Sequence, residues 1–172
     1  MHSSAEKENM YLVPLASDPA TLRRVFGHYP SGVAAIAATI QGEDFVLISS
    51  SFTVGVSFEP PLVLFSVQKS SQSWPSLRQA QHLGVSVLGN EQGSLCRQLS
   101  GERETRFSNV PLKRTETDAL FFSGASIWLD CSVYATHEAG DHDVIVLQVH
   151  SVMSDHDLDP LVYHGSRFRP LN

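Results

Sequence analysis

The chain has 172 residues, with 12 lysines and arginines against 18 aspartates and glutamates, for a net charge of −6. This length suits one domain with a sizeable core of its own. The negative charge repels phosphate backbones and anionic lipids on average, so we expect neither a nucleic-acid coat nor a membrane-surface protein. We expect residues 1–17 to form a loose N-terminal tail and residues 18–172 a single domain.

The two cysteines and the N-terminal residues indicate a cytoplasmic protein. Cys96 and Cys131 form no CxxC motif, and two thiols do not make a disulfide framework. Residues 1–10 carry charged side chains and no apolar segment typical of a secretory signal. No stretch approaches the roughly 18 apolar residues that cross a bilayer. We therefore expect reduced thiols and no membrane segment.

A helix is expected over residues 18–27. Asp18 can cap its N-terminus, Pro19 suits its first turn and Gly27 suits its C-terminal end. This helix opens the predicted domain.

The next segments predict strands. Apolar runs over 33–40 and 45–48 flank the polar turn 41–44, which is typical of a hairpin. The run 62–67 follows Pro60 and Pro61, which stop a helix, and predicts a buried central strand.

The second half of the chain predicts two short helices and three strands. The helices are expected over 74–81 and 91–99, with a strand over 83–88 between them. Long alternating runs over 127–135 and 144–152 predict two further strands. At least six strands joined by tight turns, with three short helices, favour an antiparallel barrel over a doubly wound sheet.

Several catalytic motifs are absent from the sequence. No two of the eleven glycines lie two residues apart, so a GxGxxG dinucleotide fingerprint is excluded. Neither the P-loop lysine nor a GxSxG motif is present. The eight histidines form no HExxH and match no Cys/His ligand spacing, so we expect no metal site.

Two hydroxyl clusters end predicted strands, over residues 49–53 and 69–73. Hydroxyls and free backbone N–H groups at such turns suit a phosphate ester. Residues 97–114 hold five of the twelve basic side chains, and one of them can supply a cation for that phosphate. The alternative reading, soluble turns beside a solvated basic face, stays open at this point.

Five short motifs occur in order along most of the chain. They are F-G-H-Y-P-S-G-V over 26–33, S-S-F-T with V-S-F-E-P-P-L-V over 50–63, T-R-F-S-N-V over 105–110, A-G-D-H over 139–142 and P-L-V-Y-H-G over 160–165. In these motifs the chain resembles the short-chain flavin reductase family. Its members are the NAD(P)H:flavin oxidoreductase components that feed reduced flavin to two-component flavin-dependent monooxygenases.

The resemblance implies a mainly β fold, a split β-barrel (antiparallel and Greek-key-like) with a few short helices, assembled as a homodimer. It also implies an FMN or FAD site. Residues that would line the ring and ribityl chain are Ile48, Ser49, Ser50, Ser51 and Thr53. Those that would hold phosphate are Lys69, Ser70, Ser71 and Ser73, with Arg106 and Phe107 closing the site.

The resemblance implies a nicotinamide site as well, for NADH or NADPH. His142 corresponds to the histidine near the nicotinamide and is the candidate catalytic residue; the alternative is a turn residue bonded to Asp141 or Asp143. The segment near the pyridine nucleotide would be Tyr163, His164 and Gly165, with Arg167.

Three positions depart from the family pattern. The loop after Thr53 is one residue longer than usual, Ile48 replaces a threonine, and Leu147 stands where glycine is common. We expect a reshaped loop, one polar flavin contact fewer and a narrower approach to the flavin at Leu147.

The implied activity is hydride transfer from NAD(P)H to flavin, with oxygen chemistry on a separate monooxygenase. One alternative is a flavin-binding electron-transfer or sensor module without efficient reductase turnover. Another is a barrel that holds haem through His28 or His164.

Overall fold

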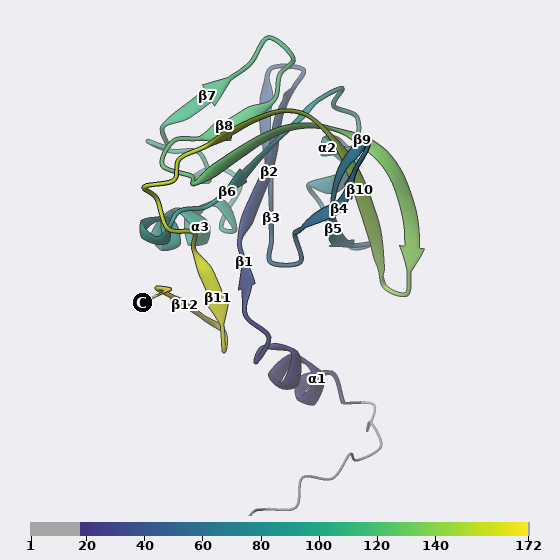
Figure 1. Ribbon diagram of the computed structural model, residues 1–172, viewed down its shortest axis with the longest axis vertical. Helices are drawn as coiled ribbons and strands as arrows, with labels where there is room; N and C mark the ends of the chain where they lie inside the picture. Colours follow the sequence, from purple (N-terminus) through teal and green to yellow (C-terminus); the bar gives the residue numbers. More distant parts are fainter. Residues whose placement is uncertain (1–17, 172) are drawn as a thin grey trace, which may run out of the picture.

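The structure is a computed structural model that describes residues 18–171, so the predicted tail 1–17 lies outside the described residues. Its main element is a strongly curved sheet of seven strands in the order β3-β2-β6-β9-β10-β5-β4, and every neighbouring pair is antiparallel (Figure 1). These strands are β2 (Ala34–Ile40), β3 (Glu43–Ser49), β4 (Thr53–Phe58), β5 (Pro61–Gln68), β6 (Leu83–Val87), β9 (Ile127–Ala139) and β10 (His142–Ser154).

Two small sheets complete the β-structure. One joins β1 (Ser31–Gly32), β11 (Val162–His164) and β12 (Arg167–Arg169), and the other joins β7 (Leu112–Arg114) and β8 (Leu120–Phe122). The predicted antiparallel barrel is therefore confirmed, although the sequence patterns did not indicate these short strands.

Residues with positive φ angles form the turns of two hairpins. The β2–β3 turn places Gln41 at φ 53° and Gly42 at φ 83°, the pair of positive φ angles that a two-residue hairpin turn needs. The β9–β10 hairpin turns at Gly140, with φ 64°. Register shifts between Val146 and Leu147, and again further along β10, bend this long hairpin around the barrel (Figure 1).

The core lies on both faces of β2. Ala34, Ile36 and Ala38 belong to one cluster of buried apolar side chains, and Ala35 and Ala37 belong to the other. Alanines leave room for larger partners on each side, such as Phe65 in the first cluster and Phe122 in the second. β2 therefore has the central place in the core.

The strand predicted over 62–67 exists as β5, but it is not central. It lies second from the edge of the sheet, between β10 and β4. Val63, Phe65 and Val67 are buried, whereas the side chains between them are partly exposed. The continuous apolar run hid this one-sided burial, since strands buried on one face normally alternate with polar residues.

The N-terminal helix is α1 (Pro19–Phe26). Asp18 caps it by accepting from the backbone N–H groups of Ala20 and Thr21, both at 3.1 Å. Hydrogen bonds from Thr21 lower the pKa of the Asp18 carboxyl. None of the helix side chains is buried, and α1 lies outside the barrel (Figure 1).

The other predicted helices are shorter or divided. The helix expected over 74–81 ends early, as α2 (Trp74–Leu77). The one expected over 91–99 is the 3₁₀ turn η1 (Asn90–Gln92) followed by α3 (Gly93–Leu99). The strands were better predicted than the helices because each short helix packs few side chains, and local propensity alone sets its ends poorly.

The three departures from the family pattern now have places in the fold. The segment after Thr53 forms the edge strand β4, and a register shift with Gly55 at φ 72° takes up its extra length. Leu147 is fully buried in the core beside Val63, so it fills the interior and does not narrow an approach to a ligand. Ile48 lies in a pocket described below.

Both cysteines are free and buried. Burial raises the pKa of the Cys131 thiol to about 12 and also raises that of Cys96. Both side chains therefore stay protonated near neutral pH and are poor nucleophiles. Among residues 18–171, no helix is long and apolar enough to cross a membrane.

Gly84 in β6 packs against the backbone of β8 and offers a test of the fold. A Cβ atom at Gly84 would lie 2.2 Å from the carbonyl oxygen of Leu120. We expect Gly84→Ala to lower the free energy of unfolding by about 3 kcal/mol, because backbone must shift to admit the methyl group. Urea unfolding measures this. The control is Gly32→Ala, whose Cβ would meet nothing within 4 Å; equal stability of the two variants would contradict this packing.

Candidate functional site

The first hollow lies where β3 and β5 end, and we call it the serine pocket. Its volume is about 420 Å³. Its lining combines apolar side chains with hydroxyls and one histidine: Leu47, Ile48, Ser49, Ser50, Ser51, Ser66, Val67, Gln68, Ser71 and His142. Pockets of 300–1,000 Å³ with a few polar groups in an apolar wall are typical small-molecule sites.

Ser51 shapes this pocket through its hydroxyl. Its Oγ accepts from the backbone N–H of Ser66 at 2.9 Å and lies 3.2 Å from the Ser66 carbonyl oxygen. The hydroxyl also lies 2.9 Å from that of Ser49. Ser51 lies two residues before Thr53, which pairs with Leu64 of β5, so its hydroxyl continues the β4–β5 pairing beyond the strand ladder. Ser50, in contrast, has no side-chain hydrogen bond to any residue in the described range 18–171.

His142 stands at the start of β10 and is about one-third exposed. Its Nδ1 lies 2.8 Å from a carboxylate oxygen of Asp141. The hydrogen bond from His142 lowers the pKa of the Asp141 carboxyl, which therefore stays ionised near neutral pH and can only accept. Nδ1 then carries the proton, and Nε2 is left for another partner.

A second, larger hollow of about 930 Å³ opens beside the serine pocket, and we call it the entrance groove. Its walls come from α1 and the segment after it, from residues 50–54, and from Tyr163 and Ser166. Ser50, Ser51 and His142 line both hollows. A molecule in the groove would therefore meet a molecule in the serine pocket at these three residues.

A third hollow, of about 370 Å³, adjoins both. It is lined by Val33, Ile48, Ser50, Cys96, Arg97, Ser100, Tyr163 and Phe168. The Arg97 guanidinium lies 5.6 Å from the centre of the Phe168 ring. Ile48 lines both this hollow and the serine pocket.

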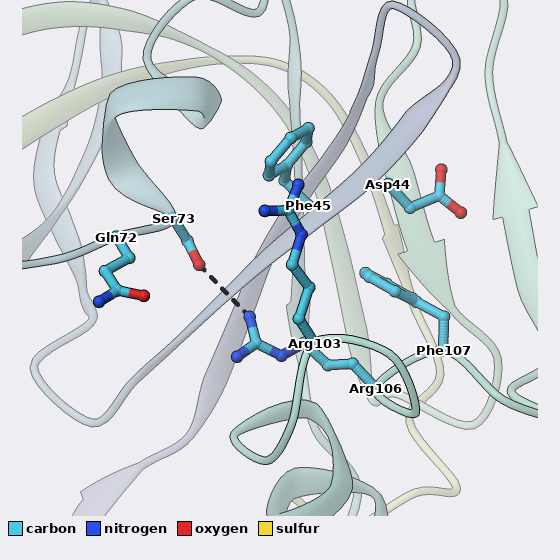
Figure 2. A pocket seen from close by; sticks show the side chains of 7 residues that line it. All are labelled: Asp44, Phe45, Gln72, Ser73, Arg103, Arg106 and Phe107. Carbon is cyan, nitrogen blue, oxygen red and sulfur yellow. Dashed lines mark hydrogen bonds between the residues drawn. The ribbon is translucent and has the colours of Figure 1, made fainter.

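A fourth, small hollow of about 80 Å³ lies against the loop between α3 and β7, and we call it the arginine pocket (Figure 2). Asp44, Phe45, Gln72, Ser73, Arg103, Arg106 and Phe107 line it. Arg106 is anchored there by its own loop. Its Nε and Nη2 donate to the Gly101 carbonyl oxygen at 3.1 and 2.7 Å, and Nη1 donates to Ser73 Oγ at 3.4 Å.

Gln98 in α3 holds the Arg106 loop in place. Its side-chain N–H₂ group lies within 3.3 Å of the carbonyl oxygens of Thr105, Arg106 and Ser108. The Phe107 ring stacks on Phe122 of the core, 6.4 Å between centroids and 10° between planes. Sequence reasoning missed Gln98, since a glutamine in a short helix gives no signal that it bonds a loop ten residues ahead.

The residues predicted from the sequence fall into four groups. Those gathered in the serine pocket are Ile48, Ser49, Ser50, Ser51, Ser71 and His142. Thr53 and Tyr163 line the entrance groove, and Ser73, Arg106 and Phe107 line the arginine pocket. Lys69, Ser70, His164, Gly165 and Arg167 line none of these hollows.

Three of the residues outside the hollows have other contacts. Lys69 lies 3.7 Å from a carboxylate oxygen of Glu138, in an exposed ion pair. The His164 ring meets that of His28 edge-on at 6.2 Å. The neighbouring backbone N–H of Gly165 donates to the Gly27 carbonyl oxygen at 2.7 Å, which fastens the β11–β12 turn to the end of α1.

Comparison with known proteins decides the family. Residues 26–172 match the model of the flavin reductase-like domain. The chain belongs to the flavin reductase-like family. It is 32% identical to a flavin reductase of Pseudomonas putida over 154 residues, which cover 89% of this chain and 90% of the relative. The family, the fold class and flavin reduction as the activity were therefore predicted correctly.

Solved structures agree. The NADH:FAD oxidoreductase of Streptomyces globisporus C-1027 superposes with a TM-score of 0.87 at 28% identity, covering 95% of this chain and 99% of that chain. A second structure of that protein, in complex with NAD and FAD fragments, gives a TM-score of 0.84 at 30% identity, covering 90% and 93%.

Proposed function

We propose that this chain reduces FMN or FAD with NADH or NADPH and releases the reduced flavin to a separate monooxygenase. The observation that carries the proposal is the junction of two hollows at Ser50, Ser51 and His142. A reductase of this kind must bring two ring systems into contact, and the junction gives them one meeting place.

The serine pocket fits a flavin. Leu47, Ile48 and Val67 supply apolar wall for a flat ring, and the serines supply hydrogen-bonding groups at one side. The hydroxyl of Ser50 is available to a ligand, while Ser49 and Ser51 hold each other and the backbone. The pocket therefore offers both of the surfaces that a heterocycle with a polyol chain requires.

The phosphate end would lie at the segment that begins at Lys69. Ser71 lines the serine pocket, and Ser73 with Arg106 lines the hollow next to it. Hydroxyls beside an anchored guanidinium suit a phosphate, because charge-assisted hydrogen bonds are the stronger ones. Lys69 and Ser70 line neither hollow. Lys69 would reach a phosphate only after its exposed pair with Glu138 opens, and the Ser70 hydroxyl donates to the Gln68 side chain at 3.4 Å.

The nicotinamide would enter through the groove. Thr53 and Tyr163 line it, and Arg23 adds a cation on the α1 side that suits the nucleotide phosphates. His164, Gly165 and Arg167 follow Tyr163 at the groove's edge and would contact the outer part of the nucleotide.

Bound flavin supplies the hydride acceptor, N5 of its ring, for the C4 hydrogen of the nicotinamide. The chain's task is to hold two rings within reacting distance and to exclude water. His142 serves this through its Nε2, because the ionised Asp141 fixes the proton on Nδ1. No carboxylate acid or base is needed at the junction.

Relatives support the monooxygenase partner. The chain is 29% identical over 153 residues to the reductase subunit of a flavin-dependent monooxygenase from Rhodococcus jostii, covering 89% of this chain and 78% of that subunit. A reductase of this type hands reduced flavin to its partner by diffusion or by contact, so an open site like this one suits it.

We expect NAD(P)H oxidation by the purified protein to depend on added FMN or FAD. The measurement is the loss of 340 nm absorbance with each of the four pairs of nucleotide and flavin, and the control omits flavin. The proposal is contradicted if none of the four pairs gives a flavin-dependent rate. A yellow protein that retains flavin on gel filtration yet oxidises neither nucleotide would instead favour the electron-transfer module.

His142→Ala tests the histidine. Loss of one hydrogen bond of about 1 kcal/mol raises the KM for the nucleotide about fivefold, while flavin affinity changes less than twofold. Steady-state kinetics and flavin fluorescence titration give the two values. His156→Ala, an exposed histidine in the loop after β10, is the matched control. Equal losses of nucleotide and flavin binding would assign His142 a structural role.

We propose that the chain forms the homodimer implied by the family through the outer side of β4 and α1. Phe58 is 89% exposed and Phe26 is 67% exposed, and Val54 in β4 is 61% exposed. A monomer rarely leaves so many large apolar side chains in water. A second copy of this chain would remove them from water and, because Phe26 and Val54 also line the entrance groove, would border that groove.

Sedimentation velocity at micromolar concentration tests this assembly. We expect a dimer for the wild type and a monomer for Phe58→Glu, since burying one charge per copy opposes association. The control is Leu158→Glu, in the loop before β11, which keeps the dimer. A monomeric wild type, or a dimeric Phe58→Glu, would contradict this interface.

A further inference from the structure

The arginine pocket has a positive lining. Arg103 and Arg106 both face it from one loop, and Asp44 is the single carboxylate in its wall. That carboxylate is already paired with Arg114, which also donates to Thr39 at 3.3 Å. Two guanidiniums therefore face the pocket, and Glu43, the partner of Arg103, does not line it, so the lining favours an anion.

The arginine pocket continues from the phosphate end of the serine pocket. Ser71 lines one hollow, and the next two residues, Gln72 and Ser73, line the other. β3 shows the same step, since Leu47 lines the serine pocket and Phe45 the arginine pocket. Two residues of strand span about 7 Å. The arginine pocket is also small, about 80 Å³ against about 420 Å³, so it suits a charged group rather than a ring.

The two arginines are held differently. Three nitrogens of Arg106 donate to the Gly101 carbonyl oxygen and to Ser73, so its position is fixed before any ligand arrives. Arg103 lies across the Phe45 ring at 5.5 Å (Figure 2). Its Nη2 pairs with Glu43. Both partners of that pair are more than half exposed. An exposed pair is weak, so Arg103 can exchange Glu43 for a better anion at little cost.

We propose that the arginine pocket, through Arg103, holds the second phosphate of FAD, so that this chain binds FAD more tightly than FMN. The inference rests on the proposed function and names its substrate. FMN and FAD both carry about two negative charges at neutral pH, so total charge does not separate them. They differ in reach. FMN ends at the phosphate beside Ser71, Ser73 and Arg106, whereas the diphosphate of FAD extends one group further, toward Arg103.

The test compares two substitutions that break the same ion pair from opposite sides. Arg103→Gln removes the proposed phosphate ligand and weakens FAD binding about tenfold, with less than a twofold change for FMN. Glu43→Gln frees the guanidinium, so FAD binding stays equal or tightens. Arg103→Lys keeps the charge without the planar fork and gives an intermediate loss. Dissociation constants come from flavin fluorescence titration without nucleotide, and thermal unfolding confirms that each variant is folded.

Three results would overturn the inference. Equal weakening of FAD and FMN by Arg103→Gln would place the first phosphate against Arg103, and no weakening would leave Arg103 without a ligand role. If Glu43→Gln also weakens FAD binding, the Arg103–Glu43 pair acts by holding the loop in place, and Arg103 is not shown to bind a phosphate. Wild-type oxidation of NAD(P)H with FMN separates these failures from that of the proposed function. If the wild type oxidises NAD(P)H with FMN but Arg103→Gln does not weaken FAD binding, only the present inference has failed.

Discussion

The candidate site depends on one hydroxyl that extends the pairing of β4 and β5 beyond their ladder. Ser51 lies between β3 and β4, two residues before Thr53, which pairs with Leu64 of β5. Its hydroxyl bonds to both backbone groups of Ser66, and so continues that register two residues further along β5. The segment that leaves β3 is thereby held against β5, and the serine pocket lies where β3 and β5 end. One side chain therefore both extends the strand pairing and shapes the pocket.

Local patterns predicted the parts of the fold that local physics decides. The β2–β3 hairpin followed from a polar turn between two apolar runs, and α1 followed from Asp18 and Pro19. The edge strand β4 was not predicted, because its exposed apolar side chains and its bulge at Gly55 give no alternating pattern. The burial of β2 on both faces was not predicted either, because a run of alanines does not show which elements will cover it and is equally compatible with a helix.

Residues of the candidate site could be predicted where they belong to a motif. They could not be predicted where the packing of distant elements brings them to the site. The serines at the end of β3 and His142 were identified from their motifs, and they line one pocket. Gln98 and Arg103 belong to no such motif. The loop after α3 folds back on that helix, where Gln98 bonds to it, and it also reaches β3, where Arg103 pairs with Glu43. These contacts join residues up to 60 positions apart in the sequence. No spacing rule in the sequence records such contacts.

The site pairs fixed groups with available ones. Ser49 and Ser51 are bonded to each other and to the backbone, whereas Ser50 between them has no side-chain partner among residues 18–171. Arg106 is anchored by Gly101, whereas Arg103 is held by an exposed carboxylate. Fixed groups lose little conformational entropy when a ligand binds, and available groups give up at most an exposed ion pair. A cofactor that must be bound, reduced and released in every turnover needs both, because a wall of fixed groups alone recognises shape but offers the ligand few free donors.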